Sequence, residues 1–220
     1  SEKMQGKVKV FSSSKIMNSD KGYIFSREIE KYEAKPQMRR GKKIKTGGKR
    51  KIYEGTTIQE DEEVRILVQD KELAFNVLGF FQSNVEMLEK TAQLISKHLP
   101  KGLKVLDMYG GAGTLSALCA EKAEHVTLVE HNRDAVVYAE KNLVSIPHSS
   151  YGLSGAQWIK TASQKNFDAV IIDPPRSGME KEVRQFLARS SIPLIISLSC
   201  DPATQARDCA ELIKNGYSIE

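Results

Sequence analysis

One cysteine in this sequence occupies a position where a thiol could act as a nucleophile. Cys200 follows a short apolar run and precedes Asp201 and Pro202, residue types that are favoured at the cap and the first position of a helix. A thiol at a helix N-terminus lies near the positive end of the helix dipole, which favours the reactive thiolate. We interpret Cys119 and Cys209 instead as small buried hydrophobic side chains.

Two further motifs predict a site for an adenosyl group. The segment Asp107-Met-Tyr-Gly-Gly-Ala-Gly-Thr114 leads from a predicted strand into a predicted helix, and its glycines allow positive φ and close approach of a ligand. Glu130 closes the next predicted strand, where a carboxylate can accept hydrogen bonds from both ribose hydroxyls. Because the turn reads Gly-Gly-Ala-Gly and not Gly-x-Gly-x-x-Gly, the two motifs favour S-adenosylmethionine over a dinucleotide.

A third motif, Asp173-Pro-Pro-Arg-Ser-Gly178, follows another apolar run. Two prolines after an acid give a rigid backbone with few hydrogen-bond donors, which suits a loop beside a reacting centre. In register with the glycine turn and Glu130, this loop is typical of a methyltransferase that acts on a planar base.

The elements that must position these motifs alternate along the chain after Pro100. Continuous apolar runs between amphipathic segments predict a parallel sheet covered by helices on both faces. The predicted fold class is therefore α/β, a Rossmann-like doubly wound sheet in which ligands bind beyond the carboxyl ends of the strands. A helix over 85–98 precedes the sheet, and a further strand is expected near 157–160. The other predicted strands cover 105–107, 126–130, 169–173 and 194–198, and the helices cover 115–122, 133–143, 180–189 and 203–214.

Residues 1–77 have a different pattern and are predicted to form a small β-rich module, followed by the larger domain over 78–220. Its expected strands are the short alternating segments 7–11, 22–25, 64–68 and 73–77. The chain carries a net charge of +5, and residues 1–75 hold 18 Lys and Arg against 12 Asp and Glu, a balance of +6. Nine cations without an acid lie in 35–51, a density that suits a polyphosphate backbone. We therefore predict that this module binds RNA; a solvated loop is the alternative for the basic run.

The composition excludes several other classes of protein. The 220 residues are 40% hydrophobic and 28% charged, as in ordinary globular chains. No apolar run approaches the roughly 18 residues of a membrane span. Three cysteines without ligand spacing predict neither a disulfide framework nor a metal site. We expect a monomer in the cytoplasm, where thiols stay reduced.

Four segments resemble, in order and spacing, the RNA 5-methyluridine methyltransferases, which modify tRNA or 23S rRNA. They are Phe80-Phe-Gln-Ser-Asn84, the glycine turn, the Asp-Pro-Pro loop and Ser199-Cys-Asp-Pro-Ala-Thr-Gln-Ala-Arg-Asp208, and the resemblance covers about 78–216. It implies S-adenosyl-L-methionine as the cofactor, RNA as the partner and Cys200 as the nucleophile. By the same resemblance, the cofactor and the uracil are lined by Gln82, Tyr109, Glu130 and Asp173, with Thr114 as a polar cofactor contact.

The chemistry of uracil methylation explains these residue types. C5 of uracil is a weak nucleophile, and thiolate addition at C6 makes it enolate-like, so that it attacks the sulfonium methyl group. Hydrogen bonds to the uracil stabilise the developing charge, and Gln82 and Asp173 are the candidates. A base then removes the C5 proton so that Cys200 can leave. The target base must be unstacked to enter such a site.

The sequence departs from the family pattern at three points. The family's base is a Glu in a Pro-Gln-x-x-His-x-Glu-like segment beyond the nucleophile, and Glu220 does not match it. We therefore expect the domain to continue past Glu220 and the base to lie outside this chain. The Asp that often contacts the adenine amino group is missing from 151–157. The iron–sulfur cysteines of many rRNA-modifying members are also missing, which favours a tRNA substrate.

Three other interpretations stay open. An RNA 5-methylcytosine methyltransferase also uses a Cys on C6, but its Cys follows an Asp-Ala-Pro strand end, and the matching position here is Arg176. An adenine-N6 methyltransferase would leave Cys200 unexplained. The chain could also be a catalytically inactive RNA-binding module that relies on the basic run 35–51. Methyl transfer from labelled S-adenosylmethionine to uridine-containing RNA separates this module from an enzyme.

Overall fold

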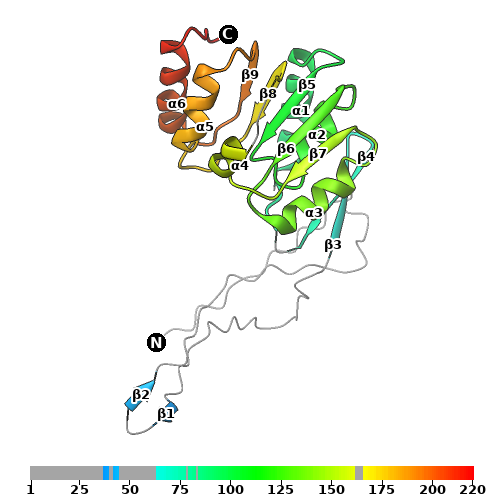
Figure 1. Cartoon of the computed structure of the whole chain (residues 1–220). Helices are drawn as coiled ribbons and strands as arrows, with labels where there is room; N and C mark the ends of the chain where they lie inside the picture. The colour runs from blue at the N-terminus through cyan, green and yellow to red at the C-terminus, as the bar shows by residue number, and fades with distance from the viewer. Residues whose placement is uncertain (1–36, 40–41, 45–62, 78, 83, 162–165) are drawn as a thin grey trace, which may run out of the picture.

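A computed structural model gives the fold of the chain and describes residues 37–39, 42–44, 63–77, 79–82, 84–161 and 166–220. Figure 1 shows a central sheet with helices on both faces and a β-hairpin beside α3. The strands are β1 (Gln37–Arg39), β2 (Lys42–Ile44), β3 (Glu63–Val68), β4 (Lys71–Asn76), β5 (Lys104–Met108), β6 (His125–Val129), β7 (His148–Tyr151), β8 (Ala169–Ile172) and β9 (Leu194–Ser197). The helices are α1 (Val85–His98), α2 (Thr114–Cys119), α3 (Arg133–Asn142), α4 (Gly155–Thr161), α5 (Lys181–Arg189) and α6 (Pro202–Lys214).

The central sheet is parallel throughout and has the strand order β7-β6-β5-β8-β9. The chain runs outward from β5 through β6 to β7, then crosses back to β8 and continues outward to β9. Successive strands therefore lead in opposite directions from the neighbours β5 and β8. The crevice beyond the carboxyl ends of these two strands is the switch point at which doubly wound sheets bind ligands. This strand order confirms the predicted α/β fold class.

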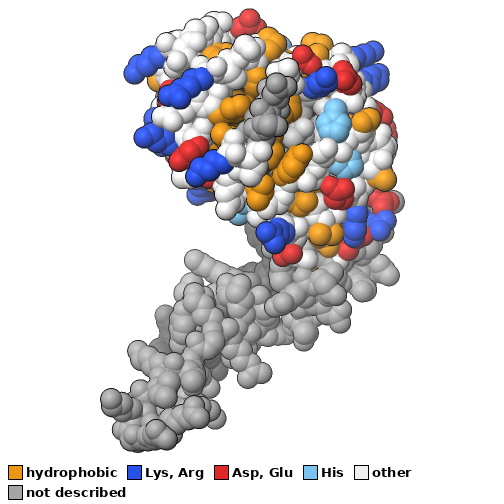
Figure 2. Space-filling model, in the orientation of Figure 1, with side chains coloured by type: hydrophobic (Ala, Val, Ile, Leu, Met, Phe, Trp, Pro, Cys, Tyr) orange, Lys and Arg blue, Asp and Glu red, His pale blue; other side chains and the backbone are white. Residues whose placement is uncertain are grey.

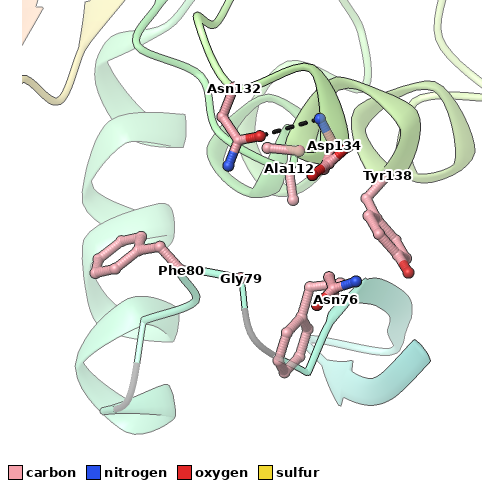
Figure 3. A pocket seen from close by; sticks show the side chains of 9 residues that line it. Asn76, Gly79, Phe80, Ala112, Asn132, Asp134 and Tyr138 are labelled. Carbon is pink, nitrogen blue, oxygen red and sulfur yellow. Dashed lines mark hydrogen bonds between the residues drawn. The ribbon is translucent and has the colours of Figure 1, made fainter. Parts of the chain in front are cut away.

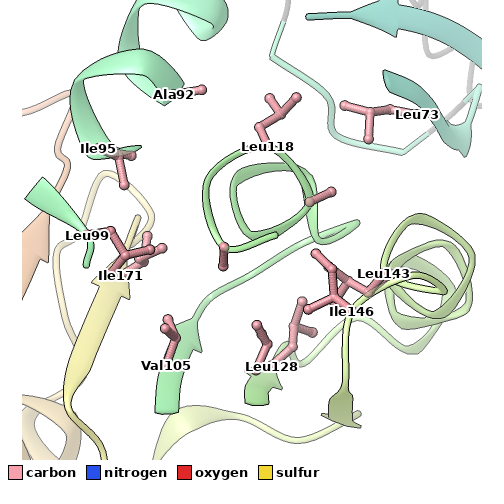
Figure 4. Packing of buried hydrophobic residues seen from close by; sticks show 14 of the residues in the cluster. Leu73, Ala92, Ile95, Leu99, Val105, Leu118, Leu128, Leu143, Ile146 and Ile171 are labelled. Carbon is pink, nitrogen blue, oxygen red and sulfur yellow. The ribbon is translucent and has the colours of Figure 1, made fainter. Parts of the chain in front are cut away.

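Both faces of the sheet are buried, and the strands alternate between two cores. Val105 of β5 and Ile171 of β8 belong to the first core, while their neighbours Leu106 and Ile172 belong to the second. The helices α1, α2 and α3 cover the first core with Ala92, Leu118 and Leu143 among other residues (Figure 4). The helices α4, α5 and α6 cover the second core with Trp158, Leu187 and Leu212. Burial on both faces explains why the strands read as continuous apolar runs.

β3 and β4 form an antiparallel hairpin with a two-residue turn. Its turn residues, Gln69 and Asp70, have positive φ values of 50° and 64°. Positive φ at both positions is the pattern of the type I′ turn, whose twist matches that of a hairpin.

The hairpin packs against the central domain and shares its core. Asn142, the last residue of α3, accepts a hydrogen bond from the Ala74 amide at 2.8 Å and donates to the Ala74 carbonyl at 2.9 Å. Val68 and Leu73 of the hairpin lie in the same buried cluster as α1. The boundary predicted at residue 77 therefore does not separate two cores, because residues 63–77 pack with the domain expected to begin at 78.

The strand predicted near 157–160 is wrong, because this stretch lies in α4, and the edge strand is β7. Ser154 and Gln157 form a capping box that starts α4: the Gln157 amide donates to Ser154 Oγ at 3.2 Å, and the Ser154 amide donates to Gln157 Oε1 at 3.1 Å. Trp158 is 2% exposed and packs against Phe167 and Phe186. The helix thus buries Trp158 on one face, in the stretch where a strand was expected.

The remaining predicted elements have mixed outcomes. The structure confirms the helix at 85–98, and the helix predicted over 115–122 ends at Cys119. The strands predicted at 7–11 and 22–25 lie outside the described residues, as does the basic run 35–51 apart from the backbone of β1 and β2. Within the described part of the chain, the helices are too short or too polar to cross a membrane.

Candidate functional site

Three carboxylates lie together at the carboxyl ends of neighbouring strands. Asp107 lies near the end of β5, Glu130 directly follows β6, and Asp173 directly follows β8. Asp107 is 2% exposed and accepts a hydrogen bond of 2.6 Å from Ser116 Oγ. Burial raises the pKa of Asp107 to about 7, with the Ser116 hydrogen bond opposing the shift and the charges of Asp173 and Glu130 adding to it. Burial also raises the pKa of Asp173. The switch point therefore gathers three carboxyl groups, and a cation bound near them would favour their ionised forms.

The glycine turn follows β5 and passes close to the neighbouring strand. A Cβ added to Gly110 would lie 2.7 Å from the Leu128 side chain, so that only glycine fits at this position. Tyr109 and Gly113 have positive φ values of 65° and 73°, and Gly113 caps α2. Thr114 is the first residue of α2 and is partly exposed. The turn thus brings backbone amides and Thr114 to the edge of the switch point.

Glu130 is held in one orientation by the backbone on both sides of it. Its Oε2 accepts a hydrogen bond from the Gly111 amide at 3.1 Å, and its Oε1 accepts one from the Asn132 amide at 2.7 Å. The exposed His131 contacts Oε1 through Nδ1 at 2.9 Å. An ionised carboxylate has about four acceptor positions. Glu130 therefore keeps one acceptor position free and gains a second if a ligand replaces the surface contact to His131; its role as a ribose ligand stays a prediction.

The hydroxyl of Tyr109 does not face the switch point freely, because it binds the protein. It accepts a hydrogen bond from the Glu180 amide at 3.0 Å and lies 3.5 Å from Glu180 Oε2. Burial raises the pKa of Tyr109 above its ordinary value. A contact between Tyr109 and a cofactor must therefore use the backbone or the ring.

Gln82 and Asp173 are 91 positions apart in the chain and are in contact in the structure. Gln82 Nε2 donates to Asp173 Oδ2 at 3.3 Å. The next residue toward the N-terminus, Phe81, stacks on Phe75 of the hairpin with ring centroids 4.2 Å apart. Asn84 then caps α1 by accepting a hydrogen bond from the Met87 amide. The hairpin and α1 thus fix the position from which Gln82 reaches Asp173.

Cys200 lies at the carboxyl end of β9, next to the strand that carries Asp173. The Leu198 amide continues the pairing of the strands by donating to the Ile172 carbonyl at 2.9 Å. Asp201 caps α6 by accepting a hydrogen bond from the Thr204 amide at 2.8 Å. Cys200 is exposed. It therefore stands, as predicted, between a strand end and a helix N-terminus.

The other two cysteines have environments that disfavour a thiolate. Cys119 is partly buried, and burial raises its pKa to about 12. Cys209 is partly buried as well, and burial raises its pKa too. Both agree with the interpretation of these side chains as packing residues.

Two buried polar residues near the site were not predicted from the sequence. Ser116 is fully buried and donates a hydrogen bond to Asp107. The sequence feature that could have predicted this role is its hydroxyl among the apolar residues of α2. Asp208 is 2% exposed on α6 and accepts a hydrogen bond from the Met179 amide at 2.8 Å, at the end of the Asp-Pro-Pro loop. Asp208 closes the motif that begins at Ser199, which was the available signal.

A hollow of about 220 Å³ opens beside the glycine turn, between the hairpin and α3 (Figure 3). It is lined by Phe75, Asn76, Gly79, Phe80, Ala112, Asn132, Asp134, Ala135 and Tyr138. Ala112 belongs to the turn, and Asn132 is the residue whose amide holds Glu130. Phe80 is 81% exposed and two residues from Gln82. The hollow therefore adjoins the carboxylate pocket without containing any of the predicted site residues. Among the described residues, no group of His, Cys, Asp and Glu could hold a metal ion.

Comparisons with known proteins identify the family of this chain. Residues 78–192 match the model of the methyltransferase small domain family. A protein of Treponema denticola named as an uncharacterized RNA methyltransferase is 40% identical over 178 residues, covering 73% of this chain and 44% of that protein. A Thermotoga maritima protein with the same name is 38% identical over 146 residues, 64% of this chain and 33% of its own length. The chain thus spans less than half the length of these relatives.

Two solved structures have a similar fold, and their names give different substrates. The Pyrococcus abyssi tRNA (uracil-54, C5)-methyltransferase, crystallised with S-adenosyl-L-homocysteine, is 30% identical with a TM-score of 0.60, over 69% of this chain and 38% of that one. The precorrin-6y C5,15-methyltransferase of Geobacter metallireducens has a TM-score of 0.54 at 17% identity, over 67% of this chain and 78% of that one. The second likeness concerns the fold alone, and a shared fold does not fix the substrate.

Proposed function

The chain belongs to the methyltransferase small domain family, and we propose that it is the catalytic part of an RNA methyltransferase that methylates C5 of uracil through Cys200. The observation that carries the proposal is the hydrogen bond between Gln82 and Asp173 directly after β8, combined with the exposed Cys200 that follows β9, the strand paired with β8. This arrangement offers polar groups for a planar base next to a nucleophile. The 30% identity to a tRNA uracil-C5 methyltransferase supports the same reaction.

S-adenosyl-L-methionine is the cofactor, and it supplies an activated methyl group on a sulfonium centre. Glu130, fixed by the amides of Gly111 and Asn132, binds the ribose hydroxyls. Burial raises the pKa of Asp107 to about 7 and raises that of Asp173 as well, so a sulfonium cation bound beside them would favour their ionised forms. The residues present therefore fit this cofactor through hydrogen-bond acceptors for the ribose and through carboxyl groups that can ionise next to a cation.

Cys200 starts the reaction by adding its thiolate to C6 of the uracil. The electron pair of the C5–C6 double bond moves toward the O4 carbonyl, and C5 would then attack the methyl carbon, whose bond to the sulfonium sulfur breaks so that S-adenosylhomocysteine leaves. A base removes the proton from C5, the double bond forms again, and the Cys200 thiolate leaves. Cys200 directly precedes Asp201, the cap of α6.

Gln82 and Asp173 select uracil by their hydrogen-bond pattern. The second amide hydrogen of Gln82 can donate to a uracil carbonyl, and the Asp173 carboxylate can accept from N3–H. Cytosine carries no hydrogen at N3, so its lone pair would face the carboxylate and be repelled. This argument favours 5-methyluridine over 5-methylcytosine as the product.

RNA is the proposed partner, with tRNA favoured over 23S rRNA. The relatives named as RNA methyltransferases support an RNA substrate. On the face in Figure 2, Lys and Arg side chains gather over α5 and α6, where they could meet phosphates. The basic run 35–51 is predicted to bind the RNA backbone as well.

The decisive experiment traps the covalent intermediate on RNA that contains 5-fluorouridine. After methyl transfer, fluorine occupies the place of the C5 proton, so that the base has nothing to remove and Cys200 cannot leave. We expect an RNA–protein adduct that survives denaturing electrophoresis and requires S-adenosylmethionine. Cys200→Ser should abolish it, because a hydroxyl ionises far less than a thiol near neutral pH.

Cys119→Ser and Cys209→Ser are the matched controls and should still form the adduct. An adduct that maps to another cysteine, or full methylation by Cys200→Ser, would overturn the proposal. RNA binding without any methyl transfer would identify the inactive RNA-binding module instead.

A further inference from the structure

The end of the Asp-Pro-Pro loop is tied to the helix that follows Cys200. The Met179 amide donates to Asp208 Oδ2 at 2.8 Å, and Arg207 Nη2 donates to the Ser177 carbonyl at 2.9 Å. Asp208 and Arg207 both belong to α6, which begins directly after the cap Asp201. Asp208 lies about two helical turns beyond the cap. One rigid helix therefore links the position of Cys200 to that of the loop carrying Asp173.

The Asp208 carboxylate is buried and balanced by two guanidinium groups. Its Oδ1 accepts from Arg207 Nη2 at 2.7 Å and from Arg184 Nη1 at 3.2 Å. Arg184 Nη1 also donates to the Met179 carbonyl at 3.1 Å, and Arg184 Nε donates to Glu211 at 2.6 Å. The two backbone groups of Met179 are thus held by this one charged network, the amide by Asp208 and the carbonyl by Arg184.

Gly178 shows how closely the loop is pressed against this network. Its φ is +81°, and an added Cβ would lie 2.2 Å from Arg207 Nη2 and 2.6 Å from Asp208 Oδ2. A side chain at this position would therefore require both a strained backbone and a displaced ion pair.

The same loop end is also tied to the glycine turn. The Glu180 amide donates to the Tyr109 hydroxyl at 3.0 Å, one residue after the bond from Met179 to Asp208. Residues 177–180 therefore connect three parts of the proposed site: the glycine turn through Tyr109, the Asp173 loop itself, and the Cys200 helix through Asp208.

We propose that Asp208, held by Arg184 and Arg207, is a positioning residue that sets Asp173 at the correct distance from Cys200 for attack on the bound uracil. The inference rests on the proposed function. A buried charged network is weak evidence for stability, because apolar residues of similar volume often stabilise a core as well or better. A network that binds both backbone groups of a loop residue has a geometric role, since its hydrogen bonds are directional.

The test measures the rate and the amplitude of adduct formation on 5-fluorouridine RNA for the unchanged protein and for Asp208→Asn. The amide keeps the volume of the side chain, but it lacks the charge and two of the acceptor positions. We expect the rate to fall on the order of 100-fold, the cost of a misplacement near 1 Å. The amplitude and the affinity for S-adenosylmethionine should stay within about twofold, because Glu130 and its partners are untouched.

Arg189→Met is the matched control, since it removes an exposed cation from the end of α5 without contacting the loop, and its rate should match that of the unchanged protein. Arg207→Lys keeps the charge but loses the planar guanidinium that joins Asp208 to Ser177. Its rate of adduct formation should lie between that of the unchanged protein and that of Asp208→Asn. If Asp208→Asn loses amplitude and cofactor affinity in parallel with its thermal stability, while its rate is unchanged, Asp208 is only structural and the inference is wrong. No adduct with the unchanged protein would instead overturn the proposed function, and the inference with it.

Discussion

Gln82 Nε2 donates a hydrogen bond of 3.3 Å to Asp173 Oδ2, and this bond joins two residues that are 91 positions apart in the chain. Gln82 precedes α1, and Asp173 directly follows β8, one of the two strands at the switch point. Their contact gives the switch point a donor and an acceptor side by side. It is the strongest structural link between the sequence motifs and the recognition of a planar base.

Replacing Gln82 with Ala should lower kcat/KM for methyl transfer to uridine-containing RNA by about 10- to 100-fold. The loss corresponds to one hydrogen bond to a charged group, about 1.5–3 kcal/mol. Steady-state kinetics with labelled S-adenosylmethionine measures it, and Gln185→Ala on α5 serves as a control that leaves the loop intact. An unchanged kcat/KM in Gln82→Ala would remove this residue from the site.

Replacing Glu130 with Ala should weaken binding of S-adenosylmethionine by about 1.5–3 kcal/mol, because it removes a charged acceptor for the ribose. The substitution also leaves the Gly111 and Asn132 amides without their acceptor. Titration calorimetry gives the affinity directly. Glu124→Gln is the control, since Glu124 is exposed near the opposite end of β6 and pairs with Lys104. Equal affinity in Glu130→Ala and the unchanged protein would show that the cofactor binds elsewhere.

Asp107 should make the stability of the protein depend on pH. Its pKa is about 7 in the folded chain, above the ordinary value of 3.8 for an aspartic acid, so the folded state holds the proton more tightly. The contribution of Asp107 to the free energy of unfolding should therefore be largest below about pH 4. It should decrease as the pH rises from about 4 to 7. Asp107→Asn mimics the protonated acid and should flatten that part of the profile. Urea unfolding across this range is the measurement, and an identical slope in both proteins would contradict the burial argument.

Asn142 should contribute to stability by fixing the hairpin. Asn142→Ala leaves the backbone groups of Ala74 and the carbonyl of Ala112 without this partner, at a cost of about 1–3 kcal/mol. The neighbouring substitution Lys141→Ala breaks a surface ion pair with Glu63 and a cation–π contact with Tyr138, and should cost at most about 1 kcal/mol. Urea denaturation compares the two variants. A smaller loss for Asn142→Ala than for Lys141→Ala would mean that the hairpin is held mainly by its apolar contacts.

Most of the α/β architecture could be predicted from local patterns. Burial on both faces gives continuous apolar strands. Few architectures other than a parallel sheet covered by helices allow such strands to alternate with amphipathic helices. The one misplaced strand was the edge strand β7, whose residues His148–Tyr151 are polar and only half buried. An edge strand pairs with one neighbour only and is less buried, so its sequence shows a weaker apolar pattern. The Ser154 and Gln157 capping box was a local signal for α4 that could have been used.

The sequence by itself determined which residues stand at strand ends, because the chemistry-bearing types Asp107, Glu130, Asp173 and Cys200 each follow an apolar run. Only the tertiary structure decided which side chains meet. The Tyr109 hydroxyl binds the Glu180 amide and does not point freely into the site. Asp208 on α6 accepts a hydrogen bond from the amide of Met179 in the segment before α5. The reason is physical: a strand end is fixed by the local pattern, whereas a hydrogen bond between distant segments depends on how packed layers set distances and angles.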